Sequence, residues 1–528
     1  MTIRKDITSG TVTFPPAGLP SRNPTSSFWL SELSQTLKGH RGTKELPEIA
    51  DMVVVGSGIT GAFAAHFLKQ RDGTGASREG QSVVMLEARE ACSGATGRNG
   101  GHCQPLVYGS APKVAAFELE VFEFMERFVR EEGVQCDWVS LTGVHAFLSK
   151  DMFELAAAEA ERLQQSHPEL AAQLEVVRPS DTTSENHTLA SLRVPSAAGV
   201  IIQKKAASLW PYKLVASILE RLIANFPAPS FNLQTNTPVT SIAQDESGKG
   251  WLLTTPRGKI TAQKVLLATN GYTSYLLPAF SDLIVPVRGQ IGALIPPGGG
   301  ANPNQGPSPN PDPPAHLIHS YVFAADPDPT SPGPLAPRDD YLIQRPLPTG
   351  ELIYGGGRRF ARGLGVGEWR DGESEEDVAR YLRQNLSPPL DLTPEGQQQQ
   401  PTVPGGELEA AFEWTGVMGY SRDHHAWVGP VPESLGGGGP DGGLWVCGGY
   451  TGHGMPAAAL SAREVARLMM GGEGAVEEGA AELPEEFVVS EERISRARGL
   501  PQLTQGWEAT NLAGLISAGG ADADGKGM

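Results

Sequence analysis

The sequence is short of cysteine and of positive charge. Its 528 residues include only four cysteines, Cys92, Cys103, Cys136 and Cys447, and none of them shows CxxC or CxxxxC spacing. A disulfide framework, a zinc site and a dithiol redox centre are therefore unsupported. Lys and Arg number 42 against 60 Asp and Glu, which gives a formal net charge of −18. We expect no binding to nucleic acid or to an anionic membrane, because both require basic patches.

Long apolar segments are also missing. The sequence has no uninterrupted apolar run of about 18 or more residues, and no apolar region of the signal-peptide kind near its start. The C-terminal letters GKGM match no peroxisomal or retention signal. We therefore expect a protein that is neither secreted nor embedded in a membrane, with the cytoplasm as its default location. The length predicts two or three domains, or one discontinuous pair.

What the sequence does have is a glycine-rich turn behind a short apolar strand. Met52–Val55 is followed by Gly56, Ser57, Gly58, Ile59, Thr60 and Gly61. Gly56 permits a sharp turn, Gly58 leaves room for a pyrophosphate, and Gly61 lets the next helix approach the strand. That helix, expected over 59–70, directs its N-terminal amides at the phosphates. The pattern predicts a dinucleotide-binding βαβ unit.

A second apolar strand, expected over 82–86, ends at Glu87. Its carboxylate is placed to accept hydrogen bonds from an adenosine ribose, and it would repel the 2′-phosphate of NADP. The acidic residue usually lies about 20 residues beyond the glycines, and here it lies farther on. We interpret the turn-rich residues 71–81 as an insertion between the helix and this strand.

Further along the chain, hydrophobic periodicity predicts other elements. We expect helices over 118–132, 152–166 and 212–226, a strand pair with a turn over 231–242, and strands over 251–255 and 260–267. Residues 444–470 predict a strand, a glycine-rich turn and a helix from about Met455, with Pro456 in its first turn. The Pro-, Gly- or Gln-rich residues 296–315, 387–407 and 435–443 are expected to be surface loops.

Together these segments resemble the D-amino acid oxidase-like family of FAD-dependent oxidoreductases, and most of all the gamma-glutamylputrescine oxidase-like branch with its fungal relatives. The matching pieces are VVVGSGITG, LEAREACSGATGRNGGH, VLLATNGYT followed by PVRGQ, YLIQRPLPTGELIYGGGR and GYTGHGMP. They occur in the family's order from about residue 50 to residue 470, so the resemblance spans most of the chain.

The resemblance implies an α/β fold: a Rossmann-like FAD-binding domain with a second α+β substrate domain on a mixed antiparallel sheet. The FAD-binding domain is expected to be discontinuous, over 46–110, 205–285 and 408–472, and the substrate domain to comprise 111–204 and 286–407. Residues 1–45 are expected to form an N-terminal arm. Residues 473–528 are expected to form a partly disordered C-terminal extension.

The resemblance also implies which residues hold the cofactor. They are Gly56, Ser57, Gly58, Ile59, Thr60, Gly61, Glu87, Ala88, Arg89, Ser93, Gly94, Ala95, Thr96, Arg98, Asn99, Gly100, Gly101, His102, Val239, Ala268, Thr269, Asn270, Gly271, Gly452, His453, Gly454 and Met455. Sarcosine-oxidising relatives carry a cysteine that bonds to the flavin in the segment corresponding to 413–423. Because none is present here, FAD is expected to be held non-covalently, and no metal is expected.

The chemistry implied is oxidation of a C–N bond in a small amine or amino-acid-like substrate. Hydride passes to the flavin, the imine hydrolyses, and dioxygen or another acceptor takes the electrons. Amino-acid-oxidising relatives place a carboxylate-binding arginine where this chain has Met418. An amine is therefore expected rather than an α-amino acid, although an arginine elsewhere could substitute. His102, Tyr420 and Arg288 are the catalytic candidates, and the alternative for each is a structural role: a hydrogen bond to the loop or the cofactor for His102, core packing for Tyr420 and a domain-interface salt bridge for Arg288.

Three alternatives stay open at this point. An NAD(P)H-linked flavoprotein would need a second dinucleotide site, and the only other glycine-rich candidate, at 363–367, follows no apolar strand. A non-catalytic flavin-binding scaffold is possible because no general base is identifiable. An oxidase of N-methyl or D-amino acids would fit the same motifs.

Overall fold

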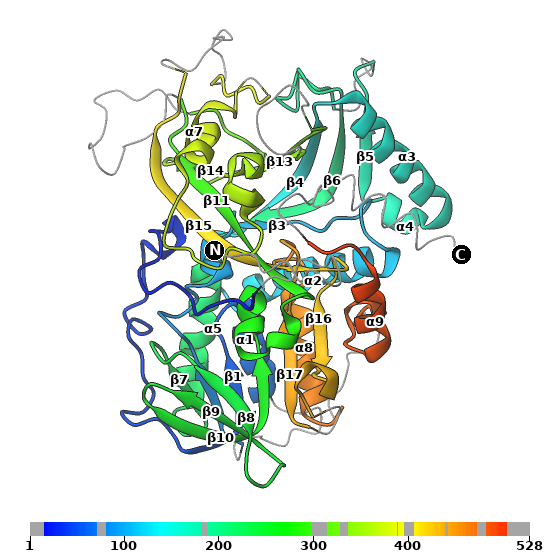
Figure 1. Ribbon diagram of the computed structural model, residues 1–528. Helices are drawn as coiled ribbons and strands as arrows, with labels where there is room; N and C mark the ends of the chain where they lie inside the picture. Colours follow the sequence, from blue (N-terminus) through cyan, green and yellow to red (C-terminus); the bar gives the residue numbers. More distant parts are fainter. Residues whose placement is uncertain are drawn as a thin grey trace.

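The computed structural model describes residues 15–70, 81–180, 187–297, 314–327, 336–387, 389–394, 406–438, 442–472 and 482–503. Two β-sheets lie one above the other, each with helices packed against it (Figure 1). Most of the insertion expected over 71–81 lies outside the described residues. So do parts of the three low-complexity segments, at 298–313, at 388 and 395–405, and at 439–441.

The first sheet carries the glycine-rich turn. Its strands run in the order β16 (Trp427–Pro430), β17 (Leu444–Gly448), β10 (Gly258–Leu267), β1 (Ile49–Val55), β2 (Val83–Leu86) and β7 (Phe231–Gln234), and the hairpin of β8 (Ser241–Gln244) and β9 (Trp251–Thr255) extends from β10. β1 is parallel to both β10 and β2, and β10 is parallel to β17. All four residues of β2 are buried, as expected for a parallel strand covered on both faces.

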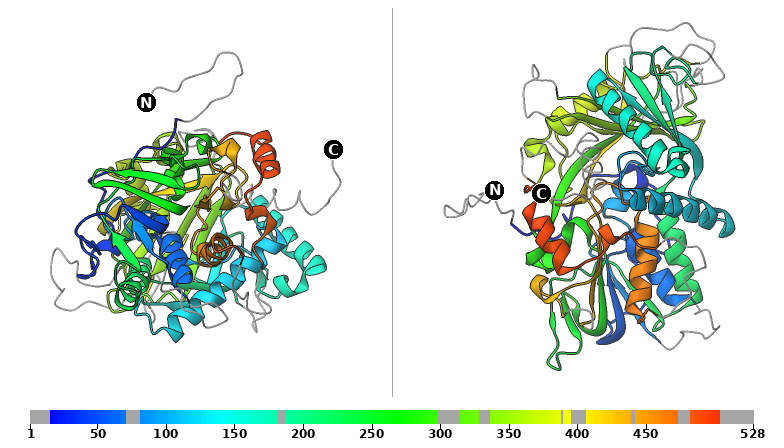
Figure 2. Two further views of the ribbon diagram at one scale, coloured as in Figure 1. Left: turned by 90° about the horizontal axis from the view of Figure 1, so that it is seen from below. Right: turned by 90° about the vertical axis from the view of Figure 1, so that its right-hand side faces the viewer.

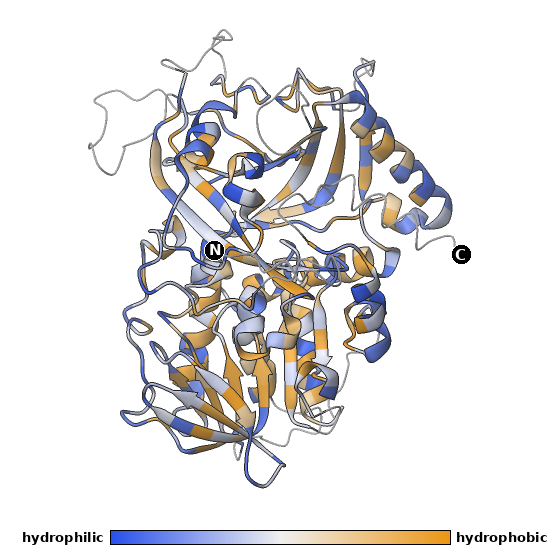
Figure 3. Ribbon diagram, viewed as in Figure 1, coloured by the Kyte–Doolittle hydropathy of each residue, from blue (hydrophilic) through white to orange (hydrophobic). Residues whose placement is uncertain are grey.

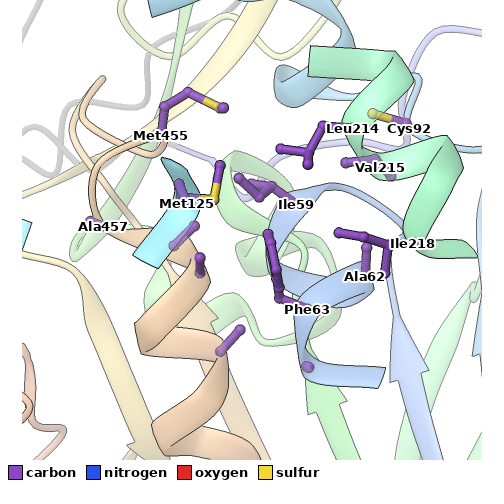
Figure 4. Packing of buried hydrophobic residues seen from close by; sticks show 14 of the residues in the cluster. Ile59, Ala62, Phe63, Cys92, Met125, Leu214, Val215, Ile218, Met455 and Ala457 are labelled. Carbon is purple, nitrogen blue, oxygen red and sulfur yellow. The ribbon is translucent and has the colours of Figure 1, made fainter. Parts of the chain in front are cut away.

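Three helices pack against one face of this sheet: α1 (Ile59–Lys69), α5 (Pro211–Asn225) and α8 (Ala458–Met469). A fourth, α2 (Pro112–Glu131), packs on α1 and α8 and shares their apolar core. Figure 4 shows Phe63 of α1 directed into a cluster formed with Met125 of α2 and Ile218 of α5. Figure 2 (right) shows α8 and α5 side by side on that face, and Figure 3 shows apolar residues concentrated in the strands beneath them. α1 is therefore held at the centre of the largest apolar core.

The second sheet is mostly antiparallel. Its strands run in the order β15 (Ala410–Ser421), β11 (Ile284–Leu294), β14 (Leu352–Gly356), β13 (Arg338–Gln344), β12 (His319–Ala325), β4 (Val139–Phe147), β6 (Gly199–Ser208) and β3 (His102–Cys103), with β5 (Leu174–Val177) paired to β6. Only the β12–β4 pair is parallel among the pairings described in this sheet. α3 (Lys150–Ser166) packs on β4 and β6, and α7 (Glu376–Gln384) packs on β11 and β14.

Short elements complete the described chain. They are η1 (Phe28–Leu30), η2 (Ala95–Arg98), α4 (Pro168–Ala171), η3 (Asn270–Tyr272), α6 (Thr273–Leu276), η4 (Pro278–Phe280), η5 (Arg358–Phe360), η6 (Arg362–Gly365), η7 (Glu433–Leu435), η8 (Glu485–Phe487) and α9 (Glu491–Gly499). Within the described ranges, no helix has both the length and the apolar character that a bilayer crossing requires.

The predicted fold class is confirmed, and most predicted elements are present. The helices expected over 118–132, 152–166 and 212–226 are α2, α3 and α5, and the strands expected over 251–255 and 260–267 are β9 and β10. The strand pair expected over 231–242 was wrong, because β7 joins β2 in the parallel sheet whereas β8 pairs with β9. The last predicted helix, α8, begins at Ala458, so Pro456 lies in the turn before it.

The two sheets do not divide at the segment boundaries expected for the domains. β3 and β15 fall within ranges predicted for the FAD-binding domain, yet both pair within the second sheet. The division into domains therefore stays a prediction. In the C-terminal extension, residues 482–503 are anchored by Arg493, whose guanidinium lies 3.8 Å from the Trp427 ring centroid and pairs with Asp423. The rest of that extension, 473–481 and 504–528, lies outside the described residues.

Candidate active site

A cavity of about 440 Å³ lies where the two sheets meet. Its floor is made by the turns that follow β1, β2, β10 and β17, at the carboxyl ends of the parallel strands, which is where open α/β sheets bind ligands. Its other wall comes from the second sheet, through residues of β11, β13 and β15 and of η5. Residues separated by hundreds of positions in the sequence therefore face one space.

The cavity brings together most of the residues predicted to hold the cofactor. Lining it are Gly56, Ser57, Gly58, Ile59, Thr60, Glu87, Ala88, Arg89, Gly94, Ala95, Thr96, Arg98, Asn99, Gly100, His102, Val239, Ala268, Thr269, Asn270, Gly452, His453, Gly454 and Met455. Four predicted residues, Gly61, Ser93, Gly101 and Gly271, do not line it. A Cβ at residue 61 would lie 2.0 Å from the Gly56 oxygen, so Gly61 allows helix α1 to pack closely rather than contacting a ligand.

The glycine turn leaves the N-terminus of α1 open to the cavity. Gly56 has φ +107°, and a Cβ there would lie 2.6 Å from the Ala268 oxygen, so only glycine is accommodated. Gly58 is the N-cap residue and has no side chain to cap the helix, the Ile59 amide donates to the Thr96 hydroxyl at 3.1 Å, and the first turn has no acidic residue. An anion placed at this helix end would meet backbone N–H groups and the positive end of the helix dipole.

Glu87 is held rigidly at the end of β2. Its Oε2 accepts hydrogen bonds from the Ser57 amide at 3.1 Å and the Ser57 hydroxyl at 2.7 Å, and its Oε1 accepts one from the Arg89 amide at 2.9 Å. The Ser57 hydroxyl in turn accepts the Cys92 amide at 3.0 Å. Oε1, which accepts one hydrogen bond, keeps a further lone pair for the ribose hydroxyl that the sequence predicts this residue to bind.

Arg89 and Arg98 share a buried carboxylate, Asp371, which sequence reasoning missed. Asp371 Oδ1 accepts from Arg89 Nη1 at 3.0 Å, and Asp371 Oδ2 lies 3.4 Å from Arg98 Nε. Burial lowers the pKa of Arg98 to about 10, although Asp371 opposes that shift. Both guanidinium groups are thus directed at Asp371 and at backbone carbonyls, and the Glu87 carboxylate is a second anion within electrostatic reach of Arg89. Nothing around Asp371 in the sequence distinguishes it from a loop residue.

His102 presents a buried nitrogen without a partner. Burial lowers the pKa of His102 to about 4, against the opposing effect of a hydrogen bond to the Leu342 backbone. Its Nε2 has no hydrogen-bond partner among the described residues. The ring lies edge-on to Tyr341, with centroids 5.6 Å apart. The neutral imidazole therefore retains an unused acceptor at the cavity wall.

Tyr420 and Arg288, the other catalytic candidates, are both at the second-sheet wall. Arg288 pairs with Glu375 just before α7, so its cation is already neutralised. The Tyr420 hydroxyl accepts a 2.7 Å hydrogen bond from Arg358 Nη2. Arg358, which sequence reasoning missed, also pairs with Asp339 at 3.3 Å. Its Nη1 is buried and has no acceptor within the described part of the chain.

His453 faces a second buried carboxyl, Glu118 of α2. His453 Nδ1 lies 3.7 Å from Glu118 Oε1, and Glu118 Oε2 accepts the Leu106 amide at 2.8 Å. Burial raises the pKa of Glu118 to about 8 and lowers that of His453 to about 4. Glu118 went unnoticed in the sequence because one glutamate on an amphipathic helix is usually solvent-exposed.

These features fit the FAD implied by the motifs. The open helix N-terminus suits a pyrophosphate, and the glycines at 56 and 58 leave room for its approach. Glu87 suits a ribose. The Tyr272 hydroxyl, like His102 Nε2, is buried at the cavity without a partner among the described residues, and a buried polar atom of this kind is expected to be satisfied by a ligand. No group of three or more metal-ligating side chains occurs in the part of the chain that the structure describes.

Comparisons with known proteins bear on the family and the fold of this chain. Residues 51–468 match the profile of the family described as FAD dependent oxidoreductase. The chain is 22% identical to a probable oxidoreductase, OrdL, of Rhizobium meliloti (strain 1021), over 80% of this chain and 83% of that protein. L-proline dehydrogenase from P. horikoshii superposes with a TM-score of 0.57 at 17% identity, over 86% of this chain and all of that one. Glycine oxidase from Geobacillus kaustophilus superposes with a TM-score of 0.54 at 18% identity, over 83% and 99%.

Proposed function

This chain belongs to the family of FAD-dependent oxidoreductases, and from that premise we propose that it oxidises a C–N bond of a small amine or amino-acid-like molecule with FAD held non-covalently. Bound FAD supplies the hydride acceptor that such an oxidation needs. The protein's own residues must bind the cofactor, orient the amine and handle its proton. Dioxygen or another acceptor completes the proposed reaction.

The observation that carries this proposal is the continuity of the cavity. A single space extends from the open N-terminus of α1, beside Glu87, to the wall formed by His102, Met418 and Tyr420. A dinucleotide that occupied the first end would reach toward the second. Two structural neighbours, glycine oxidase and L-proline dehydrogenase, act by their names on amino acids, which supports an amine or amino acid at the second end.

The second end offers both acceptors and apolar surface. His102 Nε2 can accept a hydrogen bond from an amine N–H, because the neutral imidazole keeps that lone pair free. Met418 adds an apolar surface at the same wall. This combination suits a small molecule with one nitrogen donor and an aliphatic part.

Arg358 is the residue that could bind a carboxylate on the substrate. A Cβ built on Gly452 would lie 3.5 Å from the Tyr420 hydroxyl and 3.9 Å from Met418 Sδ. The Tyr420 hydroxyl accepts its hydrogen bond from Arg358. The Arg358 guanidinium thus contacts Tyr420 and lines the same cavity as Met418, although it comes from a different strand connection. An amine that bears a carboxylate therefore stays within the proposal.

The proposal is tested by anaerobic bleaching of the purified yellow protein. Monoamines, polyamines, N-methyl amino acids, and D- and L-amino acids are mixed with the protein in turn, and flavin absorbance is followed. We expect at least one of these classes to bleach the flavin, and the product imine to yield a carbonyl compound and ammonia or an amine. No bleaching with any class would point to a non-catalytic flavoprotein instead.

The non-covalent link is tested separately by acid precipitation. We expect the yellow colour to stay in the supernatant, since residues 413–423 contain no cysteine. Colour retained in the pellet would contradict non-covalent binding.

A further inference from the structure

We propose that His453, positioned by Glu118, accepts the proton that the substrate nitrogen must lose. This inference rests on the proposed amine oxidation and adds to it the group that performs the proton transfer.

The geometry is that of a carboxyl–imidazole pair opening onto the cavity. His453 lies in the turn between β17 and α8, and its side chain is 38% exposed, whereas that of Glu118 is 4% exposed. His453 Nδ1 lies 3.7 Å from Glu118 Oε1, which is within the distance of a salt bridge. No hydrogen bond to His453 Nε2 occurs among the described residues, so this nitrogen is available to a ligand in the cavity that His453 lines.

Glu118 is unusual for its position on α2. The helix buries Val114, Phe117 and Val121 on the same side as Glu118. A carboxyl among such residues is costly to bury unless it is hydrogen-bonded or paired. Its Oε2 is fixed by the Leu106 amide, which leaves Oε1 directed at His453. The carboxyl is therefore oriented by the backbone rather than by a structural cation.

The neighbouring histidines are less suited to the task. His145 is fully hydrogen-bonded: its Nδ1 lies 2.6 Å from the Tyr108 hydroxyl, and its Nε2 lies 3.1 Å from Gln203 Nε2. Gln203 Oε1 accepts the Val107 amide, so Gln203 Nε2 must donate to the imidazole. The remaining one, His102, lines the cavity, but its Nε2 is buried and no carboxyl is paired with its ring among the described residues. His453 is the accessible member of the three.

The proposed step is a proton transfer with no change in oxidation state. The substrate arrives as an ammonium ion, one N–H bond breaks, and the electron pair of that bond stays on nitrogen. The proton forms a bond to His453 Nε2, and the Glu118 carboxylate stabilises the imidazolium through Nδ1–H. The neutral amine that results is the form from which a hydride can leave the adjacent carbon.

The pH dependence follows from the groups that face this pair. Besides one another, Glu118 has Cys103 as a titratable neighbour and His453 has His145, which itself lies near His102. Burial raises the pKa of the Cys103 thiol and lowers the pKa values of His102 and His145 to about 4 and about 3, so these three stay neutral at neutral pH. Glu118, with a pKa of about 8, is the group of this set that changes charge just above neutral pH. The rate of flavin reduction should rise with pH through about 8 as the carboxylate forms.

Glu118→Gln tests the positioning role. We expect this variant to abolish the rise in the rate of flavin reduction near pH 8. We also expect it to slow flavin reduction about 100-fold at pH 9, as is typical for loss of general-base catalysis, and to slow it less at pH 6. Glu118→Asp, which keeps a carboxyl, should retain part of this rise in rate with pH. Glu120→Gln is the matched control, because Glu120 is on the same helix, lies 3.9 Å from Arg463 and does not line the cavity. A pH profile unchanged in Glu118→Gln would overturn the proposal.

A readout independent of turnover uses tert-butylamine, which has no hydrogen on the carbon beside nitrogen and cannot be oxidised. The holoenzyme is labelled with ¹³C at the histidine ring, and His453 is assigned through His453→Gln. At pH 9 we expect tert-butylammonium, which can donate a hydrogen bond to Nε2, to shift the His453 ring signal in the unmodified protein and to shift it less in Glu118→Gln. A His453 signal that tert-butylamine does not move would overturn the proposed role of His453. Failure of the proposed function would instead appear as a flavin that no amine bleaches.

Discussion

The Ser57 hydroxyl donates a 2.7 Å hydrogen bond to Glu87 Oε2, and the Ser57 amide donates to the same oxygen. The residue between the first two glycines of the turn thus orients the carboxylate at the end of the next strand. These hydrogen bonds therefore join the turn predicted to bind the phosphates to the carboxylate predicted to bind the ribose.

Glu87→Gln should weaken FAD retention. A hydrogen bond to a charged group contributes about 1.5–3 kcal/mol, so we expect the Kd for FAD to rise about 10- to 100-fold. Ser57→Ala should have a smaller effect, because the Ser57 amide still holds Oε2. Flavin released on dialysis, followed by fluorescence, gives the measurement. Equal retention in Glu87→Gln and the unmodified protein would contradict the ribose role.

Gly61→Ala should destabilise the fold. The new Cβ would lie 2.0 Å from the Gly56 oxygen, so α1 must move away from β1. Overpacking of this kind costs about 1–3 kcal/mol, measured as the free energy of unfolding in urea. Gly499→Ala is the control, because a Cβ there meets no heavy atom within 4 Å. Similar stability of the two variants would show that α1 tolerates the shift.

Arg358→Met should discriminate among substrates. The buried guanidinium lines the cavity and has one nitrogen without an acceptor in the described chain. If an active substrate carries a carboxylate, we expect its KM to rise about 10-fold or more, with little change for a carboxylate-free amine. Arg359→Met is the matched control, since Arg359 stacks on Phe360 and does not line the cavity. Equal effects on both substrate classes would assign Arg358 a structural role.

Acid should destabilise the protein through buried neutral histidines. Burial lowers the pKa of His145 to about 3, whereas the unfolded chain binds a proton near the ordinary value of 6.5. Its contribution to stability is therefore fully present above pH 6.5 and is lost as pH falls toward 3. The slope is about 1.4 kcal/mol per pH unit for each such histidine. Urea unfolding between pH 7 and pH 4 should show a shallower slope for His145→Gln, whatever its stability at pH 7.

Local features of the chain were predictable because short-range rules govern them. The turn from Gly56 to Gly61, the burial of β2 and the placement of Glu87 follow from backbone sterics and from the periodicity of apolar residues. The same rules were misleading at 231–242, where two strands separated by a few residues belong to different pairings. Which strands pair with each other depends on the whole sheet, and the local sequence does not specify it.

The sequence by itself therefore determined the candidate cofactor site, since the glycines, the helix N-terminus and the carboxylate predicted to form it lie within one βαβ unit. Only the tertiary structure decided what faces the other end of the cavity. Arg358 meets Tyr420 across 62 positions, and Glu118 of α2 meets His453 after β17. Such pairs are created when two sheets pack together and bury polar side chains side by side. No local propensity specifies a contact of that range, because its free energy comes from the assembled core.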